Sequence, residues 1–380
     1  MATRITVVGG GYAGMALIRR LAGREGILLT LIDQNPYHTV LTEIHQVAAG
    51  NREPETLQFP YAALSGCRFI QARVHGLNPQ AKQVLTSAGP VEYDILVLAL
   101  GGVDADFGVP GVQEHTFRLH SLKEALAIRS RLDQLPEDAP VVIAGGGLTG
   151  VELAAEIGLR RRGAGNITLV EAAPSVLPGL ARKLQLGARR RLGSLGVNVL
   201  TGTPIARVEE KMVHFKDGSA LPFALMVWAC GVKGHPLVAQ MGIPVDGRGR
   251  ALVDETMQTA VPDVYALGDC AAGGLPPTAQ VANQQGTILA NYLLARLRGE
   301  ERPLEQVAIR GTLVDLGHTF GVGSLGDSLK MVGLLPAFLK RANVARWMIT
   351  AAGFSAALRY FLGLQDWGVR RSRARVKSAE

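Results

Sequence analysis

The sequence contains few cysteines and no pattern that pairs them. Its three cysteines, Cys67, Cys230 and Cys270, lie far apart, without a CxxC, a CxxxxC or a spacing typical of zinc ligands. We therefore expect no metal site and no redox centre built from thiols. Unpaired cysteines are typical of a reducing compartment, and we expect Cys230 and Cys270 to be small packing residues.

The sequence also lacks a leader pattern and a long uncharged apolar run. It enters a strand pattern almost at once, in MATRITVVGGG, which leaves no room for a charged and then apolar signal peptide. In the apolar C-terminal segment the longest uncharged run, from Trp347 to Leu358, has 12 residues. A helix that spans a bilayer needs about 18 to 20. We expect neither secretion nor a membrane-spanning helix.

Aromatic residues are scarce, at 5% of the chain, whereas glycine is abundant, with 46 residues out of 380. Many tight turns between strands and helices are typical of α/β architecture, and no segment has the composition of a disordered region. A chain of this length holds about two to three domains with sizeable cores. We therefore expect a multidomain α/β protein, and an enzyme rather than a structural protein.

The start of the chain has the pattern of a dinucleotide-binding unit. ITVVGGGYAGMALIRRLAGREGILLTLID predicts a strand, a glycine turn, an amphipathic helix and a second strand. Gly9, Gly11 and Gly14 permit a tight turn, close approach of the backbone to a pyrophosphate and close helix packing. Asp33 ends the second strand, where a carboxylate accepts hydrogen bonds from ribose hydroxyls. A GxGxxG motif alone is weak evidence, but the complete unit predicts a dinucleotide site.

A second unit of the same kind occurs in VVIAGGGLTGVELAAEIGLRRRGAGNITLVE. Its glycines are Gly145, Gly147 and Gly150, and its terminal carboxylate is Glu171. The four residues after Glu171 are uncharged, which favours NADH over NADPH because a 2′-phosphate needs a basic partner. Arg182 and Lys183 are near enough in sequence to keep NADPH open as the alternative.

The duplication extends beyond the two glycine turns. Residues 74–102 and 205–231 both predict a short-stranded meander followed by an apolar strand and a glycine. After the second copy, VDETMQTAVPDVYALGDCA supplies another apolar strand, and the chain returns to the first domain. We predict a first domain at residues 1–110 and 255–309, a second domain inserted at 111–254, and a separate C-terminal module at 310–380.

Segments spread along the chain resemble those of a known family. They are YHTVLTEIHQVAAG, YDILVLALGG with DFGVPG, GGGLTGVELAAEI, VWACGV, VYALGDCA and TAQVANQQG. With these segments the chain resembles the two-dinucleotide-binding-domain flavoproteins and, within them, the type II NADH:quinone oxidoreductases. The resemblance implies two Rossmann-like domains, one for FAD and one for NADH. It also implies that hydride passes from NADH to the flavin N5 and two electrons pass on to a membrane quinone.

The resemblance assigns further residues to the two cofactors. Asp269, preceded by Gly268, would bind the ribityl chain of FAD, although the pair can also be a simple turn at a strand end. The backbone at Ala279 and Gln280 would face the flavin where negative charge develops on reduction. The other expected contacts are Tyr12, Ala13, Gln34, Thr42, Val74, Ala99, Leu100 and Gly101 for FAD, and Leu148, Thr149, Glu152, Cys230 and Gly231 for NADH.

Four side-chain amides gather in GLPPTAQVANQQG. From Thr278 the pattern predicts a helix, on which Gln280 and Gln284 share a face. The resemblance implies that this pair lines a quinone pocket, where amides can hydrogen-bond a carbonyl or hydroxyl without carrying charge into an apolar tunnel. A solvated helix face is the alternative.

Glu152 follows the second glycine turn, in what we predict to be the first turn of a helix. A carboxylate there can simply complement the helix N-terminus. The resemblance implies instead that Glu152 lies near nicotinamide, flavin and quinone and takes part in proton delivery, which quinone reduction requires. His38 and His45 lie in a segment that matches the flavin-proximal one of the family, and we assign neither a catalytic role.

Positive charge is concentrated at the C-terminal end. The net charge is +8, and residues 330–377 contain ten Lys and Arg against one acid, Asp366. An apolar segment with Trp, Phe, Leu and basic residues, followed by RRSRARVK, is typical of an anchor on an anionic membrane surface. We expect a peripheral protein on the cytoplasmic face of the cell membrane, with a lipid-dissolved quinone and no nucleic acid as partner. A helix that docks on the protein itself or on a second subunit, in a homodimer, is the alternative.

Three other functions stay open. A sulfide:quinone oxidoreductase would need a reactive cysteine pair across the flavin, and no cysteine follows Cys270. A ferredoxin or rubredoxin reductase would also use FAD and NADH but needs no amphipathic tail. A nucleotide-sensing protein would hold flavin without efficient turnover.

Overall fold

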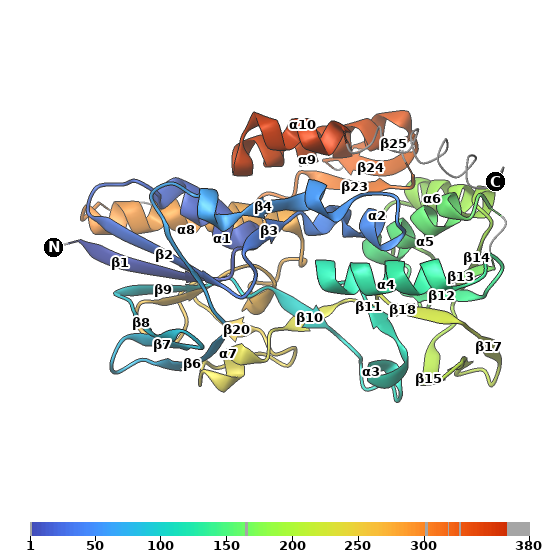
Figure 1. Ribbon diagram of the computed structural model, residues 1–380, viewed down its shortest axis with the longest axis horizontal. Helices are drawn as coiled ribbons and strands as arrows, with labels where there is room; N and C mark the ends of the chain where they lie inside the picture. The colour runs from blue at the N-terminus through green and yellow to red at the C-terminus, as the bar shows by residue number, and fades with distance from the viewer. Residues whose placement is uncertain (1, 164–165, 301–302, 318, 327, 363–380) are drawn as a thin grey trace, which may run out of the picture. The chain divides into compact units, whose positions relative to one another are not determined.

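The computed structural model describes residues 2–163, 166–300, 303–317, 319–326 and 328–362 (Figure 1). Its internal contacts group the chain into two compact units. Unit 1 consists of Met1–Thr39, Gln58–Val103 and Val232–Ile309, and unit 2 consists of Val40–Leu57, Asp104–Gly231 and Arg310–Glu380.

These units differ from the domain boundaries that the sequence predicts. We expected the chain to change domain near residues 110 and 254, whereas the contacts put the changes at residues 103 and 231. The segment from Arg310 groups with unit 2 instead of forming a separate module, and so does the short segment 40–57. The chain changes unit within or next to two short strands, β10 (Gly102–Asp104) and β19 (Val232–Gly234). Composition therefore does not mark the boundary.

Unit 1 is built around a five-stranded parallel sheet with the order β21-β9-β1-β2-β5. The strands are β1 (Thr3–Val8), β2 (Ile27–Asp33), β5 (Arg68–Gln71), β9 (Ile95–Leu98) and β21 (Val264–Ala266). A parallel sheet covered on both faces needs apolar runs rather than alternation, and β9, with the sequence ILVL, is buried along its whole length.

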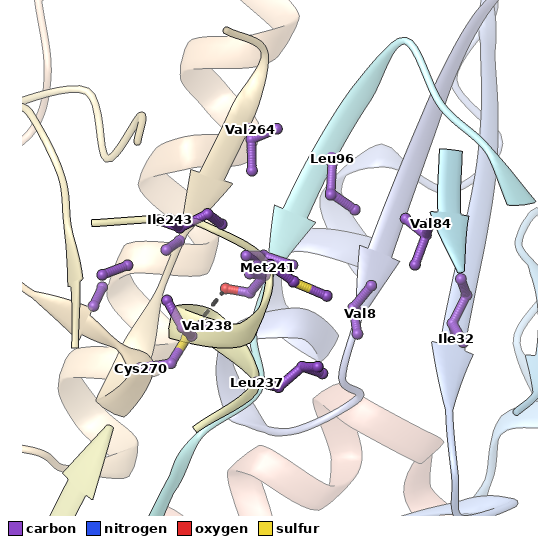
Figure 2. Close-up of a cluster of buried hydrophobic side chains, with 14 of the residues drawn as sticks. Val8, Ile32, Val84, Leu96, Leu237, Val238, Met241, Ile243, Val264 and Cys270 are labelled. Carbon is purple, nitrogen blue, oxygen red and sulfur yellow. Dashed lines mark hydrogen bonds between the residues drawn. The ribbon is translucent and has the colours of Figure 1, made fainter. Parts of the chain in front are cut away.

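Helices and a small core cover this sheet. Helix α1 (Tyr12–Leu21) packs against α8 (Ala279–Leu297), and the two approach closely because a Cβ on Gly286 would collide with the carbonyl oxygen of Ala13. Figure 2 shows the core that the sheet forms with the segment of α7 (Leu237–Gln240). Cys270 lies in this core, where its thiol donates to the Leu98 carbonyl oxygen at 3.4 Å.

The remaining elements of unit 1 are short. They are β3 (Tyr37–Thr39), β4 (Gln58–Pro60), η3 (Tyr61–Ala63), β6 (Val74–Asn78), β7 (Gln83–Thr86), β8 (Gly89–Glu92), β20 (Ala251–Leu252), η4 (Gly268–Cys270) and β22 (Ala271–Ala272). Strands β6, β7 and β8 form the antiparallel meander that the sequence predicts.

Unit 2 repeats the plan of unit 1 with a parallel sheet of order β11-β18-β12-β13-β14. Its strands are β11 (Phe117–Arg118), β12 (Val141–Ala144), β13 (Ile167–Glu171), β14 (Val197–Thr201) and β18 (Leu225–Trp228). Its helices are α3 (Val112–His115), α4 (Leu122–Gln134), α5 (Leu148–Arg160) and α6 (Arg182–Ser194), and its meander is β15 (Ile205–Glu209), β16 (Met212–Phe215) and β17 (Ala220–Pro222). In unit 1 the strand before the glycine loop, β1, lies between β2 and β9, and β9 follows the meander. In unit 2 the corresponding strand, β12, lies in the same way between β13 and β18, and β18 follows the meander. The predicted duplication is confirmed.

The segment after Arg310 forms the short strands that its sequence predicts. Strands β23 (Gly311–Asp315), β24 (Gly321–Leu325) and β25 (Leu329–Gly333) make an antiparallel sheet, against which α9 (Leu334–Ala352) packs. Gly353, with φ of 86°, separates α9 from α10 (Phe354–Leu362). None of the helices in the described ranges combines the length and the apolar character needed to cross a membrane. Unit 2 also contains η1 (Leu41–Glu43), α2 (Ile44–Ala48) and η2 (Pro54–Leu57).

Candidate dinucleotide sites and a buried charge cluster

The first and third glycines of each loop are required by the fold itself. Gly9 has φ of 100°, and a Cβ there would collide with the carbonyl oxygen of Ala99. A Cβ on Gly14 would in turn collide with the carbonyl oxygen of Gly9. The second loop repeats this geometry at Gly145, with φ of 103°, and at Gly150. Any other residue at these positions would be strained or would clash.

The middle glycine of each loop has no such reason within the chain. Gly11 and Gly147 have extended backbones, with φ of −70° and −73°, and no described atom lies within 4 Å of the Cβ that either would carry. Each begins a helix, α1 or α5, without a side-chain cap. The N–H groups and the dipole at a helix N-terminus favour an anion. The open space and the donors therefore fit a pyrophosphate that approaches the backbone.

A carboxylate at the end of the next strand completes each loop. The Gly10 N–H donates to Asp33 Oδ2 at 2.8 Å, and the Gly146 N–H donates to Glu171 Oε2 at 2.6 Å. Burial raises the pKa of Asp33, against hydrogen bonds from backbone N–H groups that lower it. The second oxygen of each carboxylate also accepts from a backbone N–H, of Asn35 at 2.8 Å for Asp33 and of Ala173 at 2.7 Å for Glu171. The carboxylates are thus fixed at the strand ends, where this type of fold binds ribose hydroxyls.

Two side chains hold the first loop, namely His38 and Tyr61, of which the sequence analysis did not single out Tyr61. His38 Nδ1 and the Tyr61 hydroxyl both donate to the Gly10 carbonyl oxygen, each at 2.8 Å. Burial lowers the pKa of His38 to about 4, so the ring is neutral at physiological pH. His38 is therefore a structural residue of the loop.

The turn that contains Asp269 is held by the helix that follows it. Gly268 has φ of 67°, and its N–H donates to Gln285 Oε1 at 2.8 Å. Helix α8 begins after Thr278, where the sequence predicts a helix, and the Thr278 hydroxyl caps it by accepting from the Val281 N–H at 3.3 Å. Of the four amides in this stretch, Gln285 is the one that is buried, and it positions the Asp269 turn.

Gln284, which we predict to line the quinone pocket with Gln280, is hydrogen-bonded within the chain. Its Nε2 donates to the Ala308 carbonyl oxygen at 2.9 Å, and the Ala308 N–H donates to its Oε1 at 3.0 Å. Both ends of the amide thus bind one backbone residue. Gln280 lies one turn earlier on the same face of α8 and is half-buried.

Glu152 does not complement the helix N-terminus. Helix α5 begins at Leu148, so Glu152 lies in its second turn, where it is buried. Its Oε1 accepts from Lys340 Nζ and from the Asp315 N–H, the latter at 3.0 Å, and its Oε2 lies 3.6 Å from His45 Nδ1. All of these residues belong to unit 2.

A larger buried charge cluster surrounds this contact. Its acidic members are Glu43, Glu152, Glu156 and Asp315, and its basic members are Arg52, Lys340 and Arg341. Lys340 Nζ lies 3.6 Å from Glu43 Oε1, and the Tyr360 hydroxyl donates to Glu43 Oε2 at 3.2 Å. Arg52 lies over the Tyr360 ring, 4.2 Å from its centroid.

The protonation of the cluster follows from its burial. Burial raises the pKa of Glu152 to about 7, although the charge of Lys340 opposes the shift. Burial and the neighbouring Asp315 raise the pKa of Glu156 to about 8. Burial alone would lower the pKa of Lys340, but the carboxylates of Glu152 and Glu43 raise it above its ordinary value. The cluster therefore holds a cationic lysine and exchanges protons near neutral pH.

The amino-acid sequence is similar to those of known oxidoreductases. Residues 3–286 match the pyridine nucleotide-disulphide oxidoreductase family. A type II NADH:quinone oxidoreductase of Staphylococcus aureus (strain MSSA476) is 30% identical over 394 residues, which cover 94% of this chain and 98% of that protein. The chain belongs to the type II NADH:quinone oxidoreductase family.

Solved structures of this family and of a neighbouring one share the fold. The structure of NDH2 from Plasmodium falciparum in complex with NADH has a TM-score of 0.86 at 17% identity, covering 96% of this chain and 98% of that one. The sulfide:quinone oxidoreductase of Aquifex aeolicus has a TM-score of 0.80 at 20% identity, with 93% of each chain covered.

Cys270 lies in the core of unit 1 and Cys230 packs against a core of unit 2, whereas Cys67 is half-buried. Burial raises the pKa of Cys67 and of Cys270 to about 11, and burial with the nearby Glu171 raises that of Cys230 to about 12. All three are protonated at neutral pH and are free of disulfides. Since the thiolate is the reactive form, they are poor nucleophiles.

The other predicted contact residues lie in varied surroundings. Leu148 and Thr149 are exposed at the start of α5, whereas Ala13 and Ala99 are buried and Val74 packs on the core of unit 1. Gln34 is exposed, and Leu100 and Gly101 lie just beyond the end of β9, after Ala99. Thr42, predicted to contact the flavin, groups with unit 2. Tyr12 begins α1, and Ala279 begins α8.

Helix α9 turns two basic residues, Lys340 and Arg341, toward the buried charge cluster. We expected Lys340 to be one of the basic residues of a membrane-facing surface. It is instead buried against Glu152 and cannot be part of such a surface. Arg346 and Arg359 are exposed. Exposed apolar residues occur on both helices, namely Leu334, Leu335, Phe338 and Ile349 on α9 and Phe354, Leu358 and Phe361 on α10. The basic run at residues 370–377 lies outside the described residues.

Proposed function

We propose that this protein is a FAD-dependent NADH:quinone oxidoreductase. The observation that carries the proposal is the repeated loop geometry, in which Gly11 and Gly147 are each open toward a ligand, within a chain of this family. The loop of unit 1, with Asp33 and Asp269, is assigned to FAD, and the loop of unit 2, with Glu171, to NADH. Bound FAD supplies the hydride and electron chemistry that no side chain can perform.

The residues of the chain bind and orient the two dinucleotides and transfer protons. The two helix N-termini bind the pyrophosphates, and Asp33 and Glu171 orient the riboses. Glu152, with a pKa near neutrality, donates or accepts a proton at its carboxylate oxygens as quinone is reduced. Lys340 and the Asp315 N–H hold that carboxylate in place.

The surroundings of Glu171 support NADH as the substrate. Glu171 accepts from the Gly146 N–H and, on its other oxygen, from the Ala173 N–H at 2.7 Å. A carboxylate fixed there repels a 2′-phosphate. Lys183, one of the two basic residues that kept NADPH open, donates to the Lys330 carbonyl oxygen at 3.4 Å.

The quinone contact is assigned to Gln280, with Gln284 as its support. Gln284 ties α8 to Ala308 and so fixes the helix face on which Gln280 lies. An amide at Gln280 can bond a quinone carbonyl without bringing a charge into an apolar site. This assignment rests on the family resemblance and on the helix geometry.

The exposed apolar residues of α9 and α10 support attachment to the cytoplasmic face of the membrane. Leu334, Phe338 and Phe354 are 69%, 67% and 72% exposed. Exposed apolar groups of this size mark interaction surfaces, and basic residues beside them favour anionic lipid. A second subunit would use the same surface in a homodimer.

A steady-state assay with a water-soluble quinone analogue tests the function. We expect NADH to outperform NADPH by at least about tenfold in kcat/KM, which corresponds to about 1.4 kcal/mol. Replacing NADH with sulfide as the electron donor should give no comparable rate. Replacing the quinone with ferredoxin as the acceptor should not either. Equal rates with the two nucleotides would overturn the assignment of NADH, and a rate that depends on ferredoxin would overturn that of quinone.

A further inference from the structure

Phe107 is exposed and held in an unfavourable backbone conformation. It lies in the turn after β10, with 69% of its surface exposed and φ of 51°. A bulky residue rarely adopts the left-handed region, because its Cβ crowds the following carbonyl oxygen. Single exposed aromatic residues are common, but strain at the same residue is not, and strained residues gather at functional sites.

The turn that presents Phe107 is held by hydrogen bonds on both sides. The Ala105 N–H donates to the Gly231 carbonyl oxygen at 2.9 Å, and the Ala105 carbonyl oxygen accepts from Trp228 Nε1 at 2.8 Å. On the far side, Gln113 Nε2 donates to Asp106 Oδ2 at 2.6 Å. The two residues that precede Phe107 are therefore held by residues of unit 2.

The ring faces the glycine that follows β18. Gly231 has φ of 119°, and Phe107 Cζ, at 4.0 Å, is the one described atom within 4 Å of the Cβ position there. Strand β18 lies beside β12, with Trp228 opposite Ala144, so Gly231 and the loop from Gly145 leave the same edge of the sheet.

The topology of the sheet decides which half of a dinucleotide would lie at Gly231. In a doubly wound sheet the ligand crosses the carboxyl ends of the strands at the point where the strand order reverses. With the pyrophosphate at Gly147 and the adenosine ribose at Glu171 on the β13 side, the other half extends over β18. That half is the nicotinamide.

We propose that Phe107 is a positioning residue that packs against the nicotinamide half of NADH over Gly231. The proposal rests on the assignment of NADH to the loop of unit 2. A ring placed there orients the nicotinamide by contact with its face.

The test compares two ligands of the holoenzyme that differ in the nicotinamide alone. NAD⁺ and ADP-ribose share the adenosine, the pyrophosphate and the second ribose. We expect Phe107→Ala to raise the Kd for NAD⁺ by roughly 3- to 10-fold, as expected for the loss of one aromatic contact. The Kd for ADP-ribose should stay unchanged, and Phe107→Tyr should restore the affinity for NAD⁺.

A second variant separates the contact from the strain. Phe107→Gly removes the ring and also the unfavourable φ, so it should fold at least as well as the wild type and still lose affinity for NAD⁺ alone. If both ligands weaken equally, Phe107 shapes the turn and the inference is wrong; it is equally wrong if neither ligand weakens. If the wild-type holoenzyme binds neither ligand, the proposed function fails, and the inference with it.

Discussion

The glycines of the two loops illustrate which residues a sequence can predict. Gly9, Gly14, Gly145 and Gly150 were predicted from spacing, and the structure supplies their steric reason. Local spacing is enough because the loop closes within a few residues. Lys340 and Glu152 could not be paired in this way, since they lie 188 residues apart and meet through tertiary packing. A lysine within an apolar helix was the one sequence signal of this buried pair, but we interpreted Lys340 as a surface charge.

Replacing the open glycines separates binding from folding. Gly11→Ala and Gly147→Ala should leave the Tm unchanged, because the Cβ meets no described atom of the chain. The added methyl group would occupy the space of the pyrophosphate. We expect Gly147→Ala to weaken NADH binding at least about tenfold, or about 1.4 kcal/mol, and Gly11→Ala to lower the flavin content.

Gly247→Ala is the matched control, because Gly247 is also open and lies outside both loops. Calorimetry and the flavin absorbance of the purified protein measure the effects. A loss of Tm without a loss of binding would show that the glycines serve the fold alone.

The buried Glu156 predicts how stability depends on pH. Its pKa is raised from 4.5 to about 8, so folding binds a proton between these values. The stabilising contribution is complete below pH 4.5 and is lost as the pH rises through about 8. Glu156→Gln removes this loss, and the decrease in Tm between about pH 6 and about pH 9 should be smaller than in the wild type.

Exposed Glu137 provides the control, since Glu137→Gln should leave the pH dependence as it is. The other members of the cluster, and the adjoining His45 and Tyr360, remain in the variant. An equal or larger decrease for Glu156→Gln would contradict the raised pKa.

At the scale of single elements, α8 shows which structural features a sequence pattern can predict. The helix was predicted from Thr278, and it begins there because the threonine hydroxyl caps it. The shared face of Gln280 and Gln284 also follows from helix geometry. The hydrogen-bond partner of Gln284 could not be predicted, because Ala308 belongs to a segment without a helix or strand pattern.

The two glutamines should respond differently to substitution. Gln284→Ala loses two hydrogen bonds to Ala308 and should lower the free energy of unfolding by roughly 1 to 3 kcal/mol. Gln280→Ala should leave stability unchanged but raise the quinone KM, with the rate of flavin reduction by NADH preserved. If Gln280→Ala slows both half-reactions equally, the quinone assignment is wrong.

At the scale of the whole molecule, the sequence predicted the duplicated α/β plan but not the grouping of its parts. The repeat was visible because each copy has the same order of strands, glycines and helix. The grouping of segment 40–57 and the C-terminal strands with unit 2 depends on buried residues such as Glu43 and Asp315. Their role is set by three-dimensional contacts, which composition does not reveal.

The apolar surface of α9 and α10 should bind anionic vesicles. Deleting the whole segment from Lys330 would also remove Lys340 from Glu152, so point changes are the sharper test. Combining Leu334→Ser, Phe338→Ser and Phe354→Ser should weaken vesicle binding by roughly 100-fold in a sedimentation assay, or about 3 kcal/mol.

Leu28→Ser and Leu252→Ser, at exposed positions of unit 1, are the control and should bind vesicles like the wild type. High salt should weaken binding without abolishing it, because apolar contacts are not screened. If the wild type ignores vesicles at low salt and the triple variant dissociates a dimer, the surface is a subunit interface.

The central claim is that one chain passes electrons from NADH to a quinone through bound FAD. Anaerobic rapid mixing of the purified protein first with NADH and then with a soluble quinone measures both half-reactions in one sample. We predict that NADH removes the visible absorbance of the oxidised flavin within the turnover time and that the quinone restores it as fast. A flavin that stays oxidised with NADH, or stays reduced when quinone is added, would contradict the account.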